Sequence, residues 1–244
     1  MKKLKNTLII LLTLLLLLIG GGYLYTKSQL HHPQKIALTA AKQATKETNS
    51  YLYFKAHHPK ENKPTVIFYQ GALVDAASYS SLALKLATNG YNVYLLKSPF
   101  DLAILAPNQA RLIVQKRPKQ TYVVGGHSLG GVVASRFAAK ATTSNLRGVF
   151  LLASYPDKKG SLAHKKITSL SITASHDQVL NWKNYRAAKQ YLPQVAVFNQ
   201  IKGGNHAGFG NYGKQKHDGN ATISNAKQQS KITQILTAWL KTIQ

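Results

Sequence analysis

One serine lies between glycines in a pattern that suits a nucleophile. A β-branched run at residues 121–124 leads into Gly126-His127-Ser128-Leu129-Gly130, and small residues with helical spacing follow. This order predicts a strand, a sharp turn and a helix, because a strained residue at the tip needs neighbours without a Cβ two positions away on each side. The Ser128 hydroxyl would project from the sheet edge, and a helix N-terminus would face a developing oxyanion. We interpret Ser128 as a nucleophile for acyl chemistry rather than as a helix cap.

A serine nucleophile needs a base, and the sequence offers one histidine in a suitable place. Of the nine histidines, His206 lies in the glycine-rich run Gly203–Gly210, directly after a strand expected at residues 195–198. An imidazole in such a loop can reach the edge of the sheet. We expect His127 to be a packed neighbour of the nucleophile and His176 to point elsewhere.

The base in turn needs an acid to orient it and to stabilise its charged form. The chain has seven acidic residues, and two of them follow an expected strand between the serine and His206. Asp177 lies just past the strand expected at residues 169–174, which matches the chain order serine, acid, histidine. Asp157 follows the preceding strand. We favour Asp177, and Asp157 stays open as the alternative.

Two backbone N–H groups are expected to bind the oxyanion. One belongs to Leu129, the residue after the nucleophile. We assign the other to Ala72, behind Gly71 in the loop after a strand expected at residues 65–69. This loop has neither the histidine nor the glycine run of the H-G-G-G motif that many lipases and esterases carry, so Ala72 depends on loop position alone.

The elements that position these residues alternate between strand and helix patterns. Such alternation predicts an α/β fold with a mainly parallel sheet that helices cover on both faces. Only a short connection, residues 153–168, separates the two strands after the serine, which leaves little room for a cap. An open site favours small or surface-displayed acyl substrates over long lipids sealed from water. Strands are expected at residues 51–54, 65–69, 91–96, 121–125, 148–152, 169–174 and 195–198, and helices at 78–87, 108–116, 129–142, 178–191 and 226–243.

The turn at Gly126–Gly130, the Asp177 loop and the run Gly203–Gly210 occur in this order, and together they resemble the α/β-hydrolase superfamily. The resemblance covers roughly residues 50–244 and is nearest to small capless members related to dienelactone hydrolase. It implies the α/β-hydrolase fold, a Ser128–His206–Asp177 triad, and acyl-enzyme chemistry that uses no cofactor.

The N-terminal part of the chain has a different composition. Three lysines precede a leucine-rich run, and residues 1–25 are predicted to be a signal anchor that spans the cell membrane as a single helix. The lysines would lie inside and the body outside; a cleaved signal peptide and a secreted protein are the alternative. Residues 26–50 are polar and predicted to be a tether or an initial helix, and residues 51–244 the catalytic domain.

Charge and composition limit the remaining choices. The 32 Lys and Arg residues against 7 Asp and Glu give a net charge of +25, so anionic envelope polymers are possible contacts, while no nucleic-acid motif is present. No metal is expected, because the adjacent pairs His31-His32 and His57-His58 lack ligand spacing and the chain has no cysteine. We expect a serine hydrolase that cleaves a carboxylic ester. An acyltransferase with the same triad, or a polymer-binding module without turnover, is the alternative.

Overall fold

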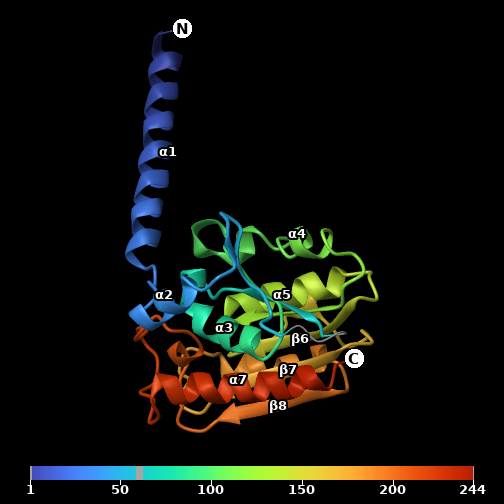
Figure 1. The fold of residues 1–244 in the computed structure, drawn as a ribbon. Helices are drawn as coiled ribbons and strands as arrows, with labels where there is room; N and C mark the ends of the chain where they lie inside the picture. Colours follow the sequence, from blue (N-terminus) through green and yellow to red (C-terminus); the bar gives the residue numbers. More distant parts are fainter. Residues whose placement is uncertain (1, 59–62, 244) are drawn as a thin grey trace.

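A twisted sheet forms the centre of the protein (Figure 1). The computed structural model describes residues 2–58 and 63–243, and within them eight strands form one sheet in the order β1-β2-β4-β3-β5-β6-β7-β8. The pairings of β1 with β2 and of β2 with β4 are antiparallel, and all later pairings are parallel. The strands are β1 (Lys46–Glu47), β2 (Tyr51–Phe54), β3 (Thr65–Tyr69), β4 (Val93–Leu96), β5 (Tyr122–His127), β6 (Leu146–Leu152), β7 (Thr168–Ala174) and β8 (Ala196–Ile201).

Helices cover both faces of the sheet, because successive strand residues point to opposite sides. Val66 and Phe68 of β3 pack with α3 and α7, whereas Ile67 and Tyr69 pack with α4 and α5. The predicted mainly parallel, two-faced sheet is therefore confirmed. The helices are α1 (Lys2–Ser28), α2 (Lys35–Ala41), α3 (Ser80–Thr88), α4 (Arg111–Val114), α5 (Leu129–Lys140), α6 (Trp182–Ala187) and α7 (Asn225–Lys241).

Two predicted helices are much shorter in the structure. The helix expected at residues 108–116 is reduced to α4, because groups before it bind outside partners: the Ala110 N–H donates to the Tyr69 hydroxyl (3.0 Å), and the Gln109 side chain donates to Lys97 O (2.7 Å). The helix expected at residues 178–191 begins only at Trp182, after a local turn in which the Val179 and Leu180 N–H groups donate to a carboxylate described below. Long-range hydrogen bonds thus accompany the late start of α4, and local ones precede α6.

Residues 26–50, predicted to be a tether or an initial helix, are a folded part of the body. Helix α2 buries Ala37 and Ala40, and β1 adds an edge strand to the sheet. The segment between α1 and α2 also joins the body, because the His31 N–H donates to Leu73 O (2.7 Å). Small alanines on one face of α2 allow this close packing, so the tether prediction is wrong for most of the segment.

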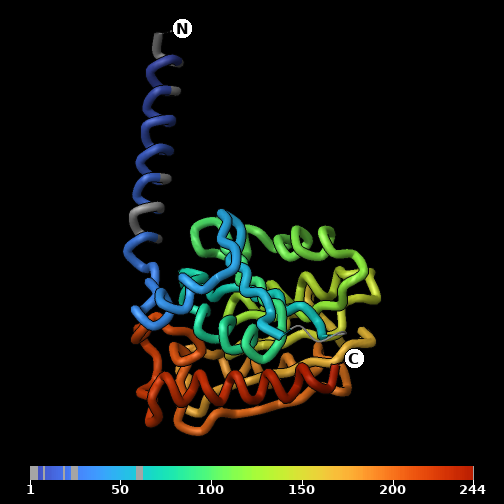
Figure 2. The backbone as a smooth tube through the Cα atoms, in the orientation of Figure 1, coloured from blue at the N-terminus to red at the C-terminus, as the bar shows by residue number. Residues whose placement is uncertain are grey.

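Helix α1 projects away from the body (Figures 1 and 2). Its window Lys5–Gly22 is long and apolar enough to cross a membrane, and none of that window is buried in the protein. Leucines such as Leu16 and Leu18 are exposed along it. Length and composition therefore agree with the predicted N-terminal transmembrane helix.

Candidate active site

The turn between β5 and α5 has the strained geometry that the glycines predict. Ser128 has φ 51° and ψ −123°, in a region that non-glycine residues rarely adopt. A Cβ on Gly130 would lie 2.3 Å from Tyr69 O, and a Cβ on Gly126 would lie 2.5 Å from the same oxygen. Glycine is required at both positions because α5 begins directly against the end of β3.

Hydrogen bonds from β6 and the residues after it hold the strained turn. The Ser128 N–H donates to Leu152 O (2.9 Å), and the Ser154 hydroxyl donates to Ser128 O (2.6 Å). Ser154 is buried and was missed in the sequence, where it appears as an ordinary residue after a strand. Its side chain fixes the carbonyl of the nucleophile candidate from the neighbouring strand.

Asp177 and His206 meet at the carboxyl end of the sheet. The carboxylate Oδ2 of Asp177 lies 2.9 Å from His206 Nδ1, and both side chains are almost fully buried. The other oxygen, Oδ1, accepts N–H donors from Val179 (3.0 Å) and Leu180 (2.8 Å). Both carboxylate oxygens are thus engaged, and the carboxylate holds the imidazole by its Nδ1 while Nε2 stays available.

Asp157, the alternative acid, is placed elsewhere. Its carboxylate pairs with the Arg136 guanidinium of α5, with Nε 3.0 Å from Oδ2, and it also accepts the Gly160 N–H (2.9 Å). The hydrogen bond from Arg136 lowers the pKa of Asp157 below its usual value. The structure therefore brings Asp177, and not Asp157, to His206.

Ser128 and His206 lie on adjoining elements. His127, the neighbour of Ser128, faces His206 with 4.5 Å between ring centroids. In the described part of the chain no hydrogen bond joins the Ser128 hydroxyl to His206, as is common before a substrate is bound. The turn that carries Ser128 therefore lies beside the Asp177–His206 pair.

The loop after β3 carries the predicted oxyanion donor Ala72. Among the described residues neither the Ala72 N–H nor the Leu129 N–H donates to a protein acceptor, so both are available to a ligand. The loop is shaped by its flanks: the Gly71 N–H donates to the Tyr79 hydroxyl (3.1 Å), and Leu73, with φ 55°, donates its N–H to Asp101 O (2.8 Å).

His127 supports this loop from beneath. Its Nδ1 lies 2.9 Å from the Tyr79 hydroxyl, and a Cβ on Gly71 would lie 2.9 Å from the same nitrogen. Burial, with a smaller contribution from the nearby His206, lowers the pKa of His127 well below its usual value. His127 is thus a neutral, packed imidazole, as the sequence predicts.

Asp218 is a third carboxylate at the site, and the sequence analysis gave it no role. It accepts the backbone N–H groups of His206 (3.2 Å) and Ala207 (2.8 Å), and more weakly that of Gln178 (3.4 Å). Asp218 therefore ties the histidine loop to the Asp177 loop. The signal that was missed is the small number of acidic residues. In a chain with only seven of them, most are expected to have a hydrogen-bond partner.

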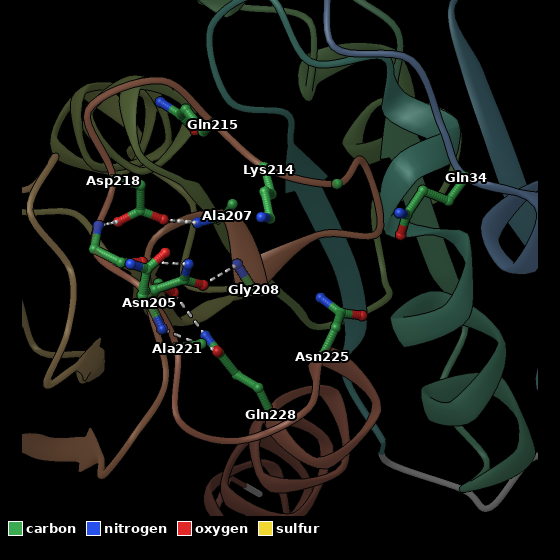
Figure 3. Close-up of a pocket in the computed structure, with 13 residues that line it drawn as sticks. Gln34, Asn205, Ala207, Gly208, Lys214, Gln215, Asp218, Ala221, Asn225 and Gln228 are labelled. Carbon is green, nitrogen blue, oxygen red and sulfur yellow. Dashed lines mark hydrogen bonds between the residues drawn. The ribbon is translucent and has the colours of Figure 1, made fainter.

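A cavity of about 450 Å³ lies behind the histidine loop (Figure 3). Asn205, Asp218 and Gln228 line it, and their hydrogen bonds to loop backbone are drawn there. Ser128 does not line this cavity. The cavity therefore lies behind the histidine loop and is not the space over the nucleophile candidate.

The other histidines lie outside the site. His176 points away, with Nδ1 2.8 Å from Asn220 O. The described residues contain no group of three or more potential metal ligands, and this includes the pairs His31-His32 and His57-His58.

The pH dependence of stability should report the buried His127. Its pKa lies below 6.5 in the folded protein, whereas the unfolded chain takes up the proton near 6.5. Stability is therefore expected to fall as pH drops below 6.5, by up to about 1.4 kcal/mol per pH unit from this group. Urea unfolding of wild type and His127→Gln at pH values from about one unit above 6.5 to about one unit below it measures this decline.

The variant should show a shallower decline over this range. The control is His164→Gln, which makes the same change at an exposed histidine. An unchanged pH slope in His127→Gln would contradict the assignment of a neutral buried imidazole.

Comparisons with known proteins agree with this fold. The sequence profile of the alpha/beta hydrolase family matches residues 65–230, more than half of the chain. No curated protein matches the sequence. Among solved structures, a dienelactone hydrolase from Anabaena variabilis is 15% identical, with a TM-score of 0.58, over 82% of this chain and 99% of that one.

Two esterases are similarly related. An esterase from the archaeon Pyrobaculum calidifontis is 15% identical, with a TM-score of 0.57, over 85% of this chain and 90% of that one. The esterase domain of a Rhodothermus marinus protein is 12% identical, with a TM-score of 0.53, over 79% and 98%. At these identities the structures share the fold, and together with the matching profile they lead to one conclusion: the chain belongs to the alpha/beta hydrolase family.

Proposed function

We propose that this protein is a serine hydrolase that cleaves a carboxylic ester through an acyl-enzyme on Ser128. The observation that carries the proposal is the buried Asp177–His206 hydrogen bond beside the strained Ser128 turn. A carboxylate that binds imidazole Nδ1 leaves Nε2 as the base, and this is the arrangement that activates a serine hydroxyl. The esterases among the structural neighbours support the same reaction.

The geometry supports a two-step reaction. His206 Nε2 takes the proton as the Ser128 oxygen attacks the ester carbonyl, and the imidazolium then gives that proton to the departing alcohol. Water repeats the sequence on the acyl-enzyme and releases the acid. The N–H groups of Leu129 and Ala72 would stabilise the oxyanion in both steps, since neither has a protein acceptor.

A fluorophosphonate probe and a chromogenic short-chain ester test the roles of the triad. Ser128→Ala should abolish labelling and turnover. Asp177→Asn should lower kcat by roughly 10³–10⁴-fold with little change in KM, because the amide keeps the shape but loses the charge that stabilises the imidazolium. Steady-state kinetics on the purified full chain measure both.

Asp157→Asn is the matched control, since it makes the same change in the ion pair with Arg136. It should leave kcat nearly unchanged. A large loss at Asp157 with an active Asp177 variant would overturn the assignment, and labelling that persists in Ser128→Ala would remove the nucleophile.

Asp218→Asn should act through the position of His206. The amide would place an NH₂ group against at least one backbone N–H that the carboxylate now accepts, which loosens the loop of His206 and Ala207. We expect a fall in kcat of roughly 10–10²-fold with a small change in KM, because sub-ångström misplacement of the base costs rate more than binding.

Thermal unfolding of the same variant, compared with Asp157→Asn, separates a loosened loop from general instability. We call the hydrogen bonds of Asp218 to the His206 and Asp177 loops the Asp218 clamp. If kcat of Asp218→Asn stays at the wild-type value, this clamp has no part in positioning His206.

We further propose that α1 anchors the enzyme in the cell membrane with the body outside. The proposal is supported by the apolar window Lys5–Gly22 and by the lysines that precede it. A hydrophobic helix holds a protein in a bilayer even when salt screens surface charge.

The full chain should therefore remain with membranes after a high-salt wash, as detected by immunoblot of the fractions. The wash is needed because a protein with a net charge of +25 also adheres to anionic lipid by charge alone. Release by salt, or a shortened form in the medium, would refute the anchor.

A further inference from the structure

The segment between α1 and α2, which we call the α1 stem, is hydrogen-bonded to the loop that carries Ala72. The His31 N–H donates to Leu73 O (2.7 Å), and the Asp75 N–H donates to His31 O (3.1 Å), which forms a short parallel bridge. Helical rise puts the end of α1 at Ser28 only about 9 Å beyond Gly22, where the apolar window ends. The three further residues to His31 add at most about 10 Å. The candidate oxyanion loop is thus held close to the level at which the helix would leave a bilayer.

The body presents an amphipathic edge in the same direction. The loop before α4, α4 itself and the residues after it lie on the edge of the body toward which α1 projects (Figure 1). We call residues 99–119 the 99–119 rim. Its exposed apolar side chains are Phe100 (60%), Leu105 (55%), Leu112 (43%) and Ile104 (37%), and its exposed charged side chains are Arg111, Lys116, Arg117 and Lys119.

The exposed charge of the 99–119 rim is positive. Asp101 is its one acidic residue, and this carboxylate is half-buried and accepts a hydrogen bond from Gln70. Exposed leucine and phenylalanine beside several lysines and arginines are typical of surfaces that lie in the headgroup layer of an anionic bilayer. A contiguous apolar patch rimmed by polar residues also marks an interaction surface.

The start of the 99–119 rim is hydrogen-bonded to the loop that carries Ala72. The Gln70 side chain donates to Asp101 Oδ1 (2.7 Å) and accepts the Ser98 N–H (3.2 Å), while the Leu73 N–H donates to Asp101 O (2.8 Å). Phe100 and Asp101 both have φ 53°, an unfavourable conformation for two successive non-glycine residues. Both residues lie next to the hydrogen bond between Asp101 and the loop that carries Ala72.

We infer that the 99–119 rim rests in the interfacial layer of the anionic bilayer that α1 enters, and that the site takes an amphiphilic ester from that bilayer. The scissile ester of such a substrate lies at headgroup level, where the neighbouring oxyanion loop is held, and its acyl chain can stay in the lipid. The inference that the site takes its ester from the bilayer rests on the proposed function. An anionic polymer would satisfy the basic residues but would leave Leu105 and Phe100 in water.

Single labelled cysteines test the membrane contact, because the chain has no native cysteine. The environment-sensitive dye NBD is attached to Leu105→Cys of the full chain, which is reconstituted in phosphatidylglycerol-rich vesicles. The matched control is Val195→Cys, an exposed valine next to β8 at the opposite edge of the body. We expect a blue-shifted emission and quenching by nitroxide lipids about fivefold stronger at position 105 than at position 195.

Water-like emission at both positions would overturn the membrane contact. Weaker quenching in purely zwitterionic vesicles would support the contribution of the basic residues. If the label at position 105 stays in water while soluble polyphosphate protects the rim lysines from acetylation, the partner is an anionic polymer and the bilayer contact is refuted.

Paired substrates test the route of the ester. The double variant Leu105→Ser/Leu112→Ser should cleave a long-chain ester embedded in vesicles about fivefold more slowly than wild type, with an unchanged rate on a water-soluble short-chain ester. The control Val195→Ser/Val197→Ser should match wild type on both. An unchanged rate of the rim variant on the vesicle ester would overturn the route. If wild type cleaves neither ester, the proposed function fails, while the fluorescence result still decides the membrane contact.

Discussion

The site depends on one steric constraint, the close approach of α5 to the end of β3. Gly126 and Gly130 both face Tyr69 O at distances that leave no space for a Cβ. This approach forces Ser128 into backbone angles that cost about 1–3 kcal/mol. The hydrogen bonds to Leu152 and from Ser154 offset that cost by about 1 kcal/mol each. The strained turn is therefore held by the end of β6 and the residues that follow it.

The few carboxylates in the described part of this basic chain all have partners. Each of them accepts at least one side-chain or backbone hydrogen bond. Asp177 and Asp218 share the histidine loop, one through the imidazole and the other through the backbone. The remaining carboxylates and their partners are Asp157 with Arg136, Asp101 with Gln70, Asp75 with Ala77, and Glu47 with Lys97.

The loop that carries Ala72 connects the site to the N-terminal helix. It is held by Tyr79 from beneath, by Asp101 from the 99–119 rim and by His31 from the α1 stem. Three segments far apart in the sequence therefore determine where its free N–H lies. Such fixed positioning matters for an oxyanion donor, because its stabilisation depends on being placed before the charge develops. It also means that the orientation of α1 and the geometry of the site are linked.

Local patterns in the sequence predicted what neighbouring residues decide among themselves. The glycines around Ser128 predicted the elbow, because the clash of a Cβ is a property of the turn itself. The alternation of strand and helix patterns predicted the parallel sheet, and the 3.6-residue period of apolar side chains predicted the amphipathic α7. The apolar run near the N-terminus predicted a helix of membrane-spanning length.

Contacts between distant segments were decided only by the tertiary structure. Asp157 and Asp177 both follow a strand, and it is Arg136 on α5 that occupies the first and leaves the second for His206. The Asp218 clamp joins loops from three parts of the chain, and no short window of sequence contains its partners. Before α4, the Ala110 N–H donates to the Tyr69 hydroxyl, 41 residues earlier in the chain. A hydrogen bond of this kind depends on which segments the fold brings together, and a local residue pattern contains no information about that contact.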